Sequence, residues 1–289
     1  MASTLTLKRR IGSIKGTRQI TKAMELVSAS KLRRAQEYAA QSRDYRNMAY
    51  DMLQRLNIQG EVENHPLFKE REVQNRLYVV VTSNTGLAGA YNANTLKLLT
   101  QALQRDRSDK VKSHVIAIGN KGAQFVRRIH DANLTAVYPP FGDQPTANDV
   151  RPLLNSILGQ YEDGSVDEVH VIYTLFQSTI VQQTQDQQLL PAPAPDGSPD
   201  DLSLISNFEP DAETVIEQIT TRLVEAQIWQ ALLESLASEH AMRMVAMKNA
   251  TDNAKDLIDD YTLELNTARQ AAITQELAEI TGGAEALNG

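Results

Sequence analysis

The longest stretch without a helix breaker most limits what this chain can fold into. Residues 211–281 contain neither proline nor glycine, nor do residues 17–59, whereas all ten prolines lie between Pro66 and Pro210. Proline costs about 3 kcal/mol inside a helix and glycine about 1 kcal/mol. At roughly 1.5 Å per residue, one helix over the longer stretch would reach about 105 Å, too long for a compact domain of this size to bury. The pattern predicts a long N-terminal helix, a middle segment rich in breakers, and a very long C-terminal helix.

Both breaker-free stretches carry seam positions at alternating steps of three and four residues. In the first stretch, starting from Met24, small residues recur every seven positions, at Ser28, Ala35, Ser42 and Ala49. Such spacing is typical of coiled coils, and small seam residues let two helices approach closely. Because both stretches belong to one chain that returns from a middle segment, we expect them to pair antiparallel.

The ends of the second long helix are marked by residue types that favour helix boundaries. Pro210 and Asp211 stand where a helix starts, and acidic residues in a first turn suit the positive end of the helix dipole. Gly282 and Gly283 predict the end of this helix.

The middle segment alternates between strand and helix patterns. Apolar runs predict buried strands at 76–83, 113–120 and 167–176, and a partner strand at 178–191. Helices are expected near 92–107, 120–131 and 147–162. This alternation is typical of an open α/β sheet, and the proline-rich residues 191–201 read as a linker.

The expected fold class is therefore α/β plus a long antiparallel coiled coil. The N- and C-terminal helices form a shaft, and an open-sheet, Rossmann-like α/β domain is inserted between them. The expected domains are an N-terminal shaft helix, the inserted domain with its proline-rich exit linker, and a C-terminal shaft helix, over residues 1–60, 61–205 and 206–289.

A glycine-bearing loop follows the first predicted strand, in "VVVTSNTGLAGAYNAN" (79–94). A phosphate-binding loop needs GxxxxGK[ST], and a dinucleotide loop needs GxGxxG. The loop has Gly86 and Gly89 but no lysine, and "IGNKG" (118–122) has the wrong spacing. The chain has no cysteine, no HExxH and no GxSxG. We therefore expect no catalytic, cofactor-binding or metal site.

Charge is divided unequally along the chain. Residues 1–56 carry twelve Lys or Arg and four Asp or Glu, whereas residues 211–289 carry five and fourteen. One interpretation is that the two helices face each other. A second is a coiled-coil adaptor that binds nucleic acid or an anionic membrane through its basic N-terminal helix. A third is a nucleotide-dependent enzyme built on the α/β domain. No stretch of 18 apolar residues exists, so no direct membrane insertion is expected.

Four stretches carry a resemblance to a known family. "RRIGSIKGTRQITKAMELVSASKLRRAQ" (9–36) closely resembles the N-terminal helix of the gamma subunit of F-type ATP synthases. "MVAMKNATDNAKDLI" (244–258) and "ARQAAITQELAEITGGAEAL" (268–287) resemble its C-terminal helix. "TGLAGAYN" (85–92) resembles the signature loop of its middle domain. The resemblance covers nearly the whole chain in the same order.

The resemblance implies a non-catalytic rotor subunit of the central stalk. Its partners would be the alpha and beta subunits of a hexameric ring, the epsilon subunit and the membrane rotor ring of c subunits, with no nucleic acid. The subunit would couple ion-driven rotation of that ring to the conformational cycle of the catalytic beta subunits. With no transit peptide and Met1 at the start, we expect a peripheral position on the cytoplasmic face of a bacterial plasma membrane.

The resemblance also implies site residues. Contacts with the beta subunits would come from Lys22, Met24, Glu25, Arg243, Arg269, Gln270, Thr274 and Glu276. An apical bearing would be formed by Ile273, Leu277 and Ile280. The foot that meets the rotor ring and epsilon would include Arg43, Asp44, Tyr45, Phe208 and Glu209. In the signature loop Asn84, Thr85 and Ala88 replace the family's usual aspartate, arginine and cysteine.

Overall fold

The computed structural model describes residues 4–57, 66–130, 132–140, 142, 146–192 and 212–288. The chain forms two compact units. Ser28–Arg243 is named the α/β unit, and Met1–Val27 with Met244–Gly289 is named the two-helix unit. Two long helices, α1 (Thr4–Asn57) and α5 (Ala212–Asn288), contribute to both units.

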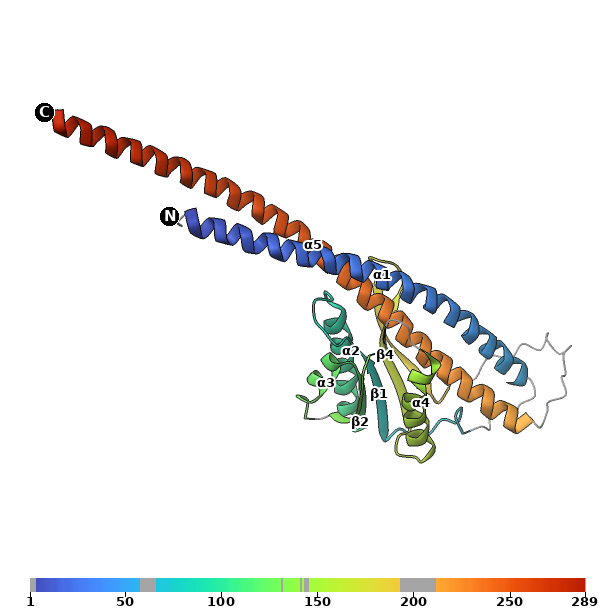
Figure 1. Ribbon diagram of the computed structural model, residues 1–289. Coiled ribbons are helices and arrows are strands. Elements are labelled where there is room, and N and C mark those ends of the chain that lie inside the picture. Colours follow the sequence, from blue (N-terminus) through green and yellow to red (C-terminus); the bar gives the residue numbers. More distant parts are fainter. Residues whose placement is uncertain are drawn as a thin grey trace. The chain divides into compact units, whose positions relative to one another are not determined.

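A five-stranded sheet organises the α/β unit (Figure 1). Between the long helices the elements are β1 (Asn75–Val81), α2 (Tyr91–Asp109), β2 (Lys112–Ile118), α3 (Asn120–Val126), β3 (Ala132–Tyr138), α4 (Ala147–Glu162), β4 (Glu168–Phe176) and β5 (Gln182–Leu190). The strand order is β3-β2-β1-β4-β5. The first four strands in this order run parallel, and β5 runs antiparallel to β4.

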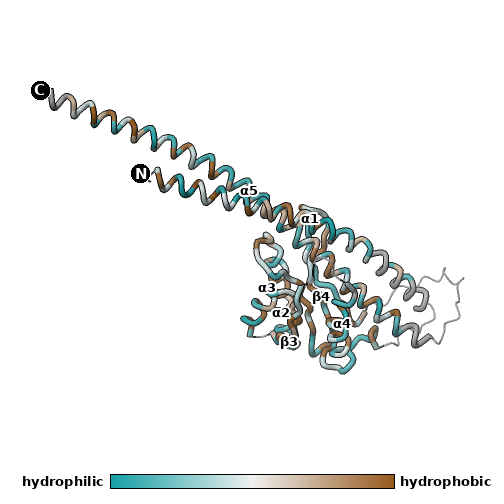
Figure 2. Tube along the Cα trace, viewed as in Figure 1, coloured by the Kyte–Doolittle hydropathy of each residue, from teal (hydrophilic) through white to brown (hydrophobic). Residues whose placement is uncertain are grey.

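Side chains of the central strand β1 alternate between two hydrophobic cores. Tyr78 and Val80 belong to the core shared with α2 and α3, whereas Leu77 and Val79 belong to the core shared with α4 and α5. All four are 0% exposed. A strand covered on both faces reads as a continuous apolar run, which explains why the sequence signal here was clear. Figure 2 shows hydrophilic and hydrophobic residues alternating along the far part of α5.

The strand β3 (Ala132–Tyr138) was not predicted from the sequence. The predicted helix at 120–131 is wrong beyond Val126, where α3 ends, and the unpredicted strand β3 follows. β3 is an edge strand in which only every second side chain is covered, so it lacks the apolar run that identified the central strands. The predicted partner strand at 178–191 is present as β5 over Gln182–Leu190.

Helix α5 does not end where its glycines predicted. The helix continues through Gly282 and Gly283 to Asn288, so the predicted end is wrong. Neither glycine takes the left-handed conformation that stops a helix, and neither would bring an added Cβ within 4 Å of another group. Glycine weakens a helix by about 1 kcal/mol but does not end it unless the backbone turns.

The two-helix unit is an antiparallel pair. The hydroxyl oxygens of Thr21 and Thr251 lie 2.8 Å apart, and the Arg10 guanidinium carbon lies 5.9 Å from the centre of the Tyr261 ring. The residue numbers of the partners therefore increase along α5 as they decrease along α1, so the two helices run in opposite directions. The predicted fold class, an open α/β sheet with a long antiparallel helix pair, is confirmed. No helix in the described part of the chain combines the length and apolarity of a membrane span.

Candidate functional site

The carboxyl edge of the sheet is where open α/β folds bind their ligands, at the point where the strand order reverses. In this unit that point lies between β1 and β4. The glycine-bearing loop that follows β1 begins there. This edge is therefore the first place to look for a nucleotide site.

Polar groups of the loop after β1 form hydrogen bonds with other groups of the same chain. The Ser83 backbone N–H donates to Asn92 Oδ1 at 3.0 Å, and the Ser83 hydroxyl donates to the Thr85 carbonyl oxygen at 2.6 Å. Asn84 Oδ1 accepts a hydrogen bond from the backbone N–H of Asn120 at 3.1 Å. These bonds fix the shape of the loop and connect it to the start of α3.

Helix α5 crosses the same edge and forms hydrogen bonds to α2 and β4. Ser235 Oγ lies 2.7 Å from the Tyr91 hydroxyl oxygen and accepts a hydrogen bond from the Thr174 backbone N–H at 3.4 Å. One turn later, the Ser238 hydroxyl donates to the Thr174 carbonyl oxygen at 3.0 Å. Two serines of α5 thus hold the first turn of α2 and the end of β4.

A buried carboxylate completes this attachment, because Glu234 Oε2 accepts a hydrogen bond from the Phe176 backbone N–H at 3.2 Å. Glu234, Ser235 and Ser238 are all 0% exposed. We name as the α5 clasp Tyr91, Thr174, Phe176, Glu234, Ser235 and Ser238.

Little space is left beside the clasp. A cavity of about 20 Å³ remains between α5 and the carboxyl ends of β1 and β2. That is room for about one water molecule, whereas small-molecule sites usually measure about 300–1,000 Å³. Helix α5 therefore occupies the place in which an open α/β sheet would hold a nucleotide.

Arg243 is the one predicted partner contact that lies in the α/β unit and has a described side chain. Arg243 is 9% exposed, and its Nη2 lies 2.7 Å from Glu239 Oε1 and 3.5 Å from the Thr85 hydroxyl. Burial raises the pKa of Glu239, although the Arg243 guanidinium opposes this. Thr85, which stands where the family usually has an arginine, is therefore contacted by Arg243 of the same chain.

In the two-helix unit, the predicted partner contacts are largely exposed. Lys22 Nζ lies 3.0 Å from Glu25 Oε1, an ion pair within one turn of α1, and Met24 is half-buried. The polar positions on α5 are all exposed, namely Arg269, Gln270, Thr274 and Glu276. The apolar positions Ile273, Leu277 and Ile280 are 50%, 58% and 67% exposed.

The predicted foot cannot be placed in the same way. Arg43, Asp44 and Tyr45 belong to α1, but their side chains are outside the described part of the structure. Phe208 and Glu209 lie outside the described residues altogether.

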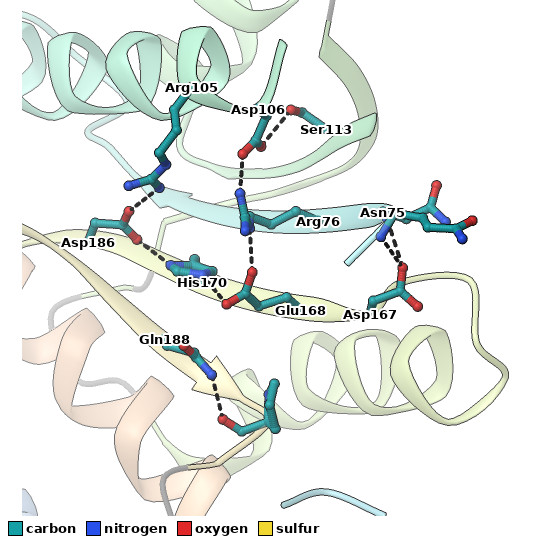
Figure 3. A network of polar contacts seen from close by, with 12 residues as sticks. Asn75, Arg76, Arg105, Asp106, Ser113, Asp167, Glu168, His170, Asp186 and Gln188 are labelled. Carbon is teal, nitrogen blue, oxygen red and sulfur yellow. Dashed lines mark hydrogen bonds and ion pairs between the residues drawn. The ribbon is translucent and has the colours of Figure 1, made fainter. Parts of the chain in front are cut away.

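A second polar cluster lies within the α/β unit and was not foreseen from the sequence (Figure 3). Arg76 on β1 forms ion pairs with Asp106 of α2 and, at 2.6 Å, with Glu168 of β4. His170 lies between two carboxylates, with Nδ1 2.7 Å from Asp186 Oδ1 and Nε2 3.2 Å from Glu168 Oε1.

This cluster is electrically balanced when His170 is protonated. Arg105 adds a further contact at 3.3 Å to Asp186, so three basic groups face three carboxylates. Burial opposes protonation, but the Asp186 and Glu168 carboxylates raise the pKa of His170. Burial likewise opposes ionisation of Glu168, yet hydrogen bonds from His170 and Arg76 lower the pKa of Glu168 to about 2. The ion pairs of Arg76 with Asp106 and of Arg105 with Asp186 fix α2 to the sheet.

These features define a class of protein: a helical stalk with an inserted α/β domain, in which the stalk's own helix fills the ligand crevice. A family model described as ATP synthase matches residues 3–287. The chain belongs to this family, and its curated relatives bear the name ATP synthase gamma chain.

Two relatives and two solved structures illustrate the similarity. The gamma chain of Macrococcus caseolyticus is 41% identical over 99% of this chain and 100% of its own length, and that of Legionella pneumophila (strain Corby) is 38% identical with the same coverage. A chain of the Euglena gracilis mitochondrial ATP synthase (OSCP/F1/c-ring, rotational state 3) matches with a TM-score of 0.68 and 17% identity, over 98% of this chain and 94% of its own. A chain of the Tetrahymena thermophila mitochondrial ATP synthase (central stalk/c-ring) matches with a TM-score of 0.57 and 24% identity, over 80% of this chain and 99% of its own. At these identities the solved structures establish the shared fold.

Proposed function

We propose that this chain is the rotor of the central stalk of an ATP synthase. In this role it turns with a membrane ring of c subunits and drives the catalytic beta subunits through their conformations. The observation that carries the proposal is the match to gamma chains over almost the whole length of the chain and of its relatives. The nucleic-acid alternative gains no support from these relatives.

The structure supplies a path for force. A turning force on the α/β unit reaches α5 through the buried bonds of the α5 clasp and through the apolar core around Leu223, Val224 and Ile228. Because α5 is continuous from Ala212 to Asn288, the same helix carries that force into the two-helix unit. Over residues 212–281 this helix contains no proline or glycine, which suits a part that must resist twisting.

The far part of α5 has the character of a partner surface. Ile273, Leu277 and Ile280 follow one another at steps of four and three, so they form one exposed apolar stripe. Exposed apolar stripes mark sites of protein contact. We assign this stripe to the apical bearing, and the beta contacts to Lys22, Met24, Glu25, Arg243, Arg269, Gln270, Thr274 and Glu276.

An asymmetric rod explains how one subunit can serve three catalytic sites. A single rod cannot present the same face to three identical beta subunits, so each site is biased to a different conformation. That bias is a coupling through differential contacts, and rotation moves it from site to site. The proposal includes no catalytic site in this chain, and it places the foot at Arg43, Asp44, Tyr45, Phe208 and Glu209, against epsilon and the c ring. Since the relatives named above are bacterial, we place the complex on the cytoplasmic face of a bacterial plasma membrane.

Reconstitution tests the rotor role directly. The full chain is combined with alpha and beta subunits, and a probe attached to the α/β unit is watched while ATP is supplied. We expect ATP-driven rotation in one direction, and no ATP hydrolysis by the chain alone. A chain that hydrolysed ATP by itself, or a reconstituted complex that hydrolysed ATP at full rate without rotating the probe, would refute the proposal.

A further inference from the structure

The amino edge of the sheet, opposite the α5 clasp, carries an open groove of about 640 Å³. It lies where α2 ends and where β2 and β3 begin. We name it the basic groove, and its polar lining includes Arg107, Lys110, Lys112, His114, His130 and Asn133. Its volume falls within the range of about 300–1,000 Å³ of small-molecule sites.

The charge of the basic groove is one-sided. Among the residues described for this region, three permanent cations and two histidines line it, and no carboxylate does. Of the adjacent acids, Asp109 is exposed but does not line the groove, whereas Asp106 is 0% exposed and its carboxylate is bound by Arg76 and, at 2.9 Å, by the Ser113 hydroxyl. Asp106 therefore belongs to the buried cluster and does not neutralise the groove. Like charges gathered in one hollow create a positive potential that concentrates anions.

Hydrogen-bond donors accompany these charges. Asn133 Nδ2 lies 3.2 Å from His114 Nδ1, and when the amide donates this bond the proton of a neutral ring resides on Nε2. Burial and the Lys112 ammonium lower the pKa of His114, a local sign of the positive field. Arginine and lysine together with an imidazole donor form the chemistry that recognises phosphate oxygens.

We propose that the basic groove binds a phosphate group, with Lys110 and Lys112 as its main charged contacts. The site goes beyond the rotor function and does not depend on it. The phosphate can belong to a small soluble ligand or to a lipid headgroup, and the two sources share the chemistry of the contact. Binding brings negative charge beside His114, so the bound phosphate and the protonated imidazole stabilise each other.

The test uses the full chain with ¹⁵N-labelled histidine. The pKa of His114 is measured by NMR in inorganic pyrophosphate and in sodium chloride of equal ionic strength. We expect the pKa of His114 to rise saturably with pyrophosphate and to stay unchanged in sodium chloride. The double variant Lys110→Gln/Lys112→Gln should weaken pyrophosphate binding about tenfold, because each exposed charge contact contributes up to about 1 kcal/mol. A second arm replaces pyrophosphate with vesicles of phosphatidylglycerol and identifies a lipid source if only these bind.

A matched control removes the same charge elsewhere on the α/β unit. Lys69→Gln/Lys97→Gln changes two exposed lysines outside the groove and should leave the binding unchanged. Equal loss of binding in both double variants would overturn the proposal, since it would mean general attraction to the chain. A pKa of His114 that neither pyrophosphate nor the vesicles move would overturn it as well. The chemical shifts of His170 report whether each variant is folded.

Discussion

Ser235→Ala is the sharpest test of the α5 clasp. The change removes the partner of the Tyr91 hydroxyl, which is 1% exposed and whose other contact is a long one of 3.5 Å to the Val81 carbonyl oxygen. It also removes the acceptor for the Thr174 backbone N–H. A buried polar group left without a partner costs about 1–3 kcal/mol. We expect the free energy of unfolding of the α/β unit to fall by about 2 kcal/mol.

The assay follows from the single tryptophan of the chain. Trp229 packs against the core shared by α5 and the sheet, so its fluorescence during urea unfolding reports on this unit. Tyr91→Phe alone should cost about 1 kcal/mol. The double variant Tyr91→Phe/Ser235→Ala should cost about 1 kcal/mol less than the sum of the single changes, because it leaves no orphaned hydroxyl.

The control and the refuting result are equally specific. Ser108→Ala removes an exposed hydroxyl that donates to the Gln104 carbonyl oxygen within α2, and should change stability by less than about 0.5 kcal/mol. Additive costs for Tyr91 and Ser235 would show that the two residues do not interact. In that case the Ser235–Tyr91 contact does not hold α5 to α2, and the polar attachment of α5 rests on its bonds to β4 alone.

Three further predictions concern other parts of the chain. Because neighbouring carboxylates raise the pKa of His170, its stabilising effect should be complete below about pH 6.5 and should be lost as pH rises through that raised pKa; urea midpoints of His170→Gln should lack this loss. Gly119→Ala should destabilise the α/β unit by about 3 kcal/mol or more in urea unfolding, since φ is +89° and the new Cβ would lie 2.1 Å from the Thr82 carbonyl oxygen. Gly282→Ala meets open space on a continuing helix, so amide exchange at the end of α5 should slow by about fivefold, and an unchanged rate would mean that this turn is not helical.

The long helices were the most predictable part of the molecule. Over residues 211–281, the lack of proline and glycine leaves the backbone no local reason to turn, so α5 could be foreseen without knowledge of its partners. The central strands were equally clear, because burial on both faces demands apolar residues at every position. The two predictions that failed, at β3 and at Gly282–Gly283, depended on weak local signals that tertiary contacts or backbone angles decide.

The polar sites could not be predicted because their partners lie far apart in sequence. Ser235 and Tyr91 are separated by 144 residues, and neither has a neighbour that marks it as part of a contact. One signal was present: hydroxyl residues at Ser235 and Ser238 interrupt an otherwise Ala- and Leu-rich stretch. His170 likewise meets Asp186 only because β4 and β5 pair antiparallel, with His170 opposite Gln188 in a register that shifts nearby.

The position of the closing helix in the chain has a consequence for biosynthesis. The ribosome completes all five strands, ending at Leu190, before it makes α5. Helix α5 fills the carboxyl edge of the sheet and completes the core shared with α4. The nascent sheet therefore leaves the exit tunnel with its carboxyl edge open and with the core around Val79 and Val171 packed against α4 but not yet against α5. Folding of this unit must wait for residues beyond Ala212, and chaperones that bind exposed apolar strands have a defined interval in which to act.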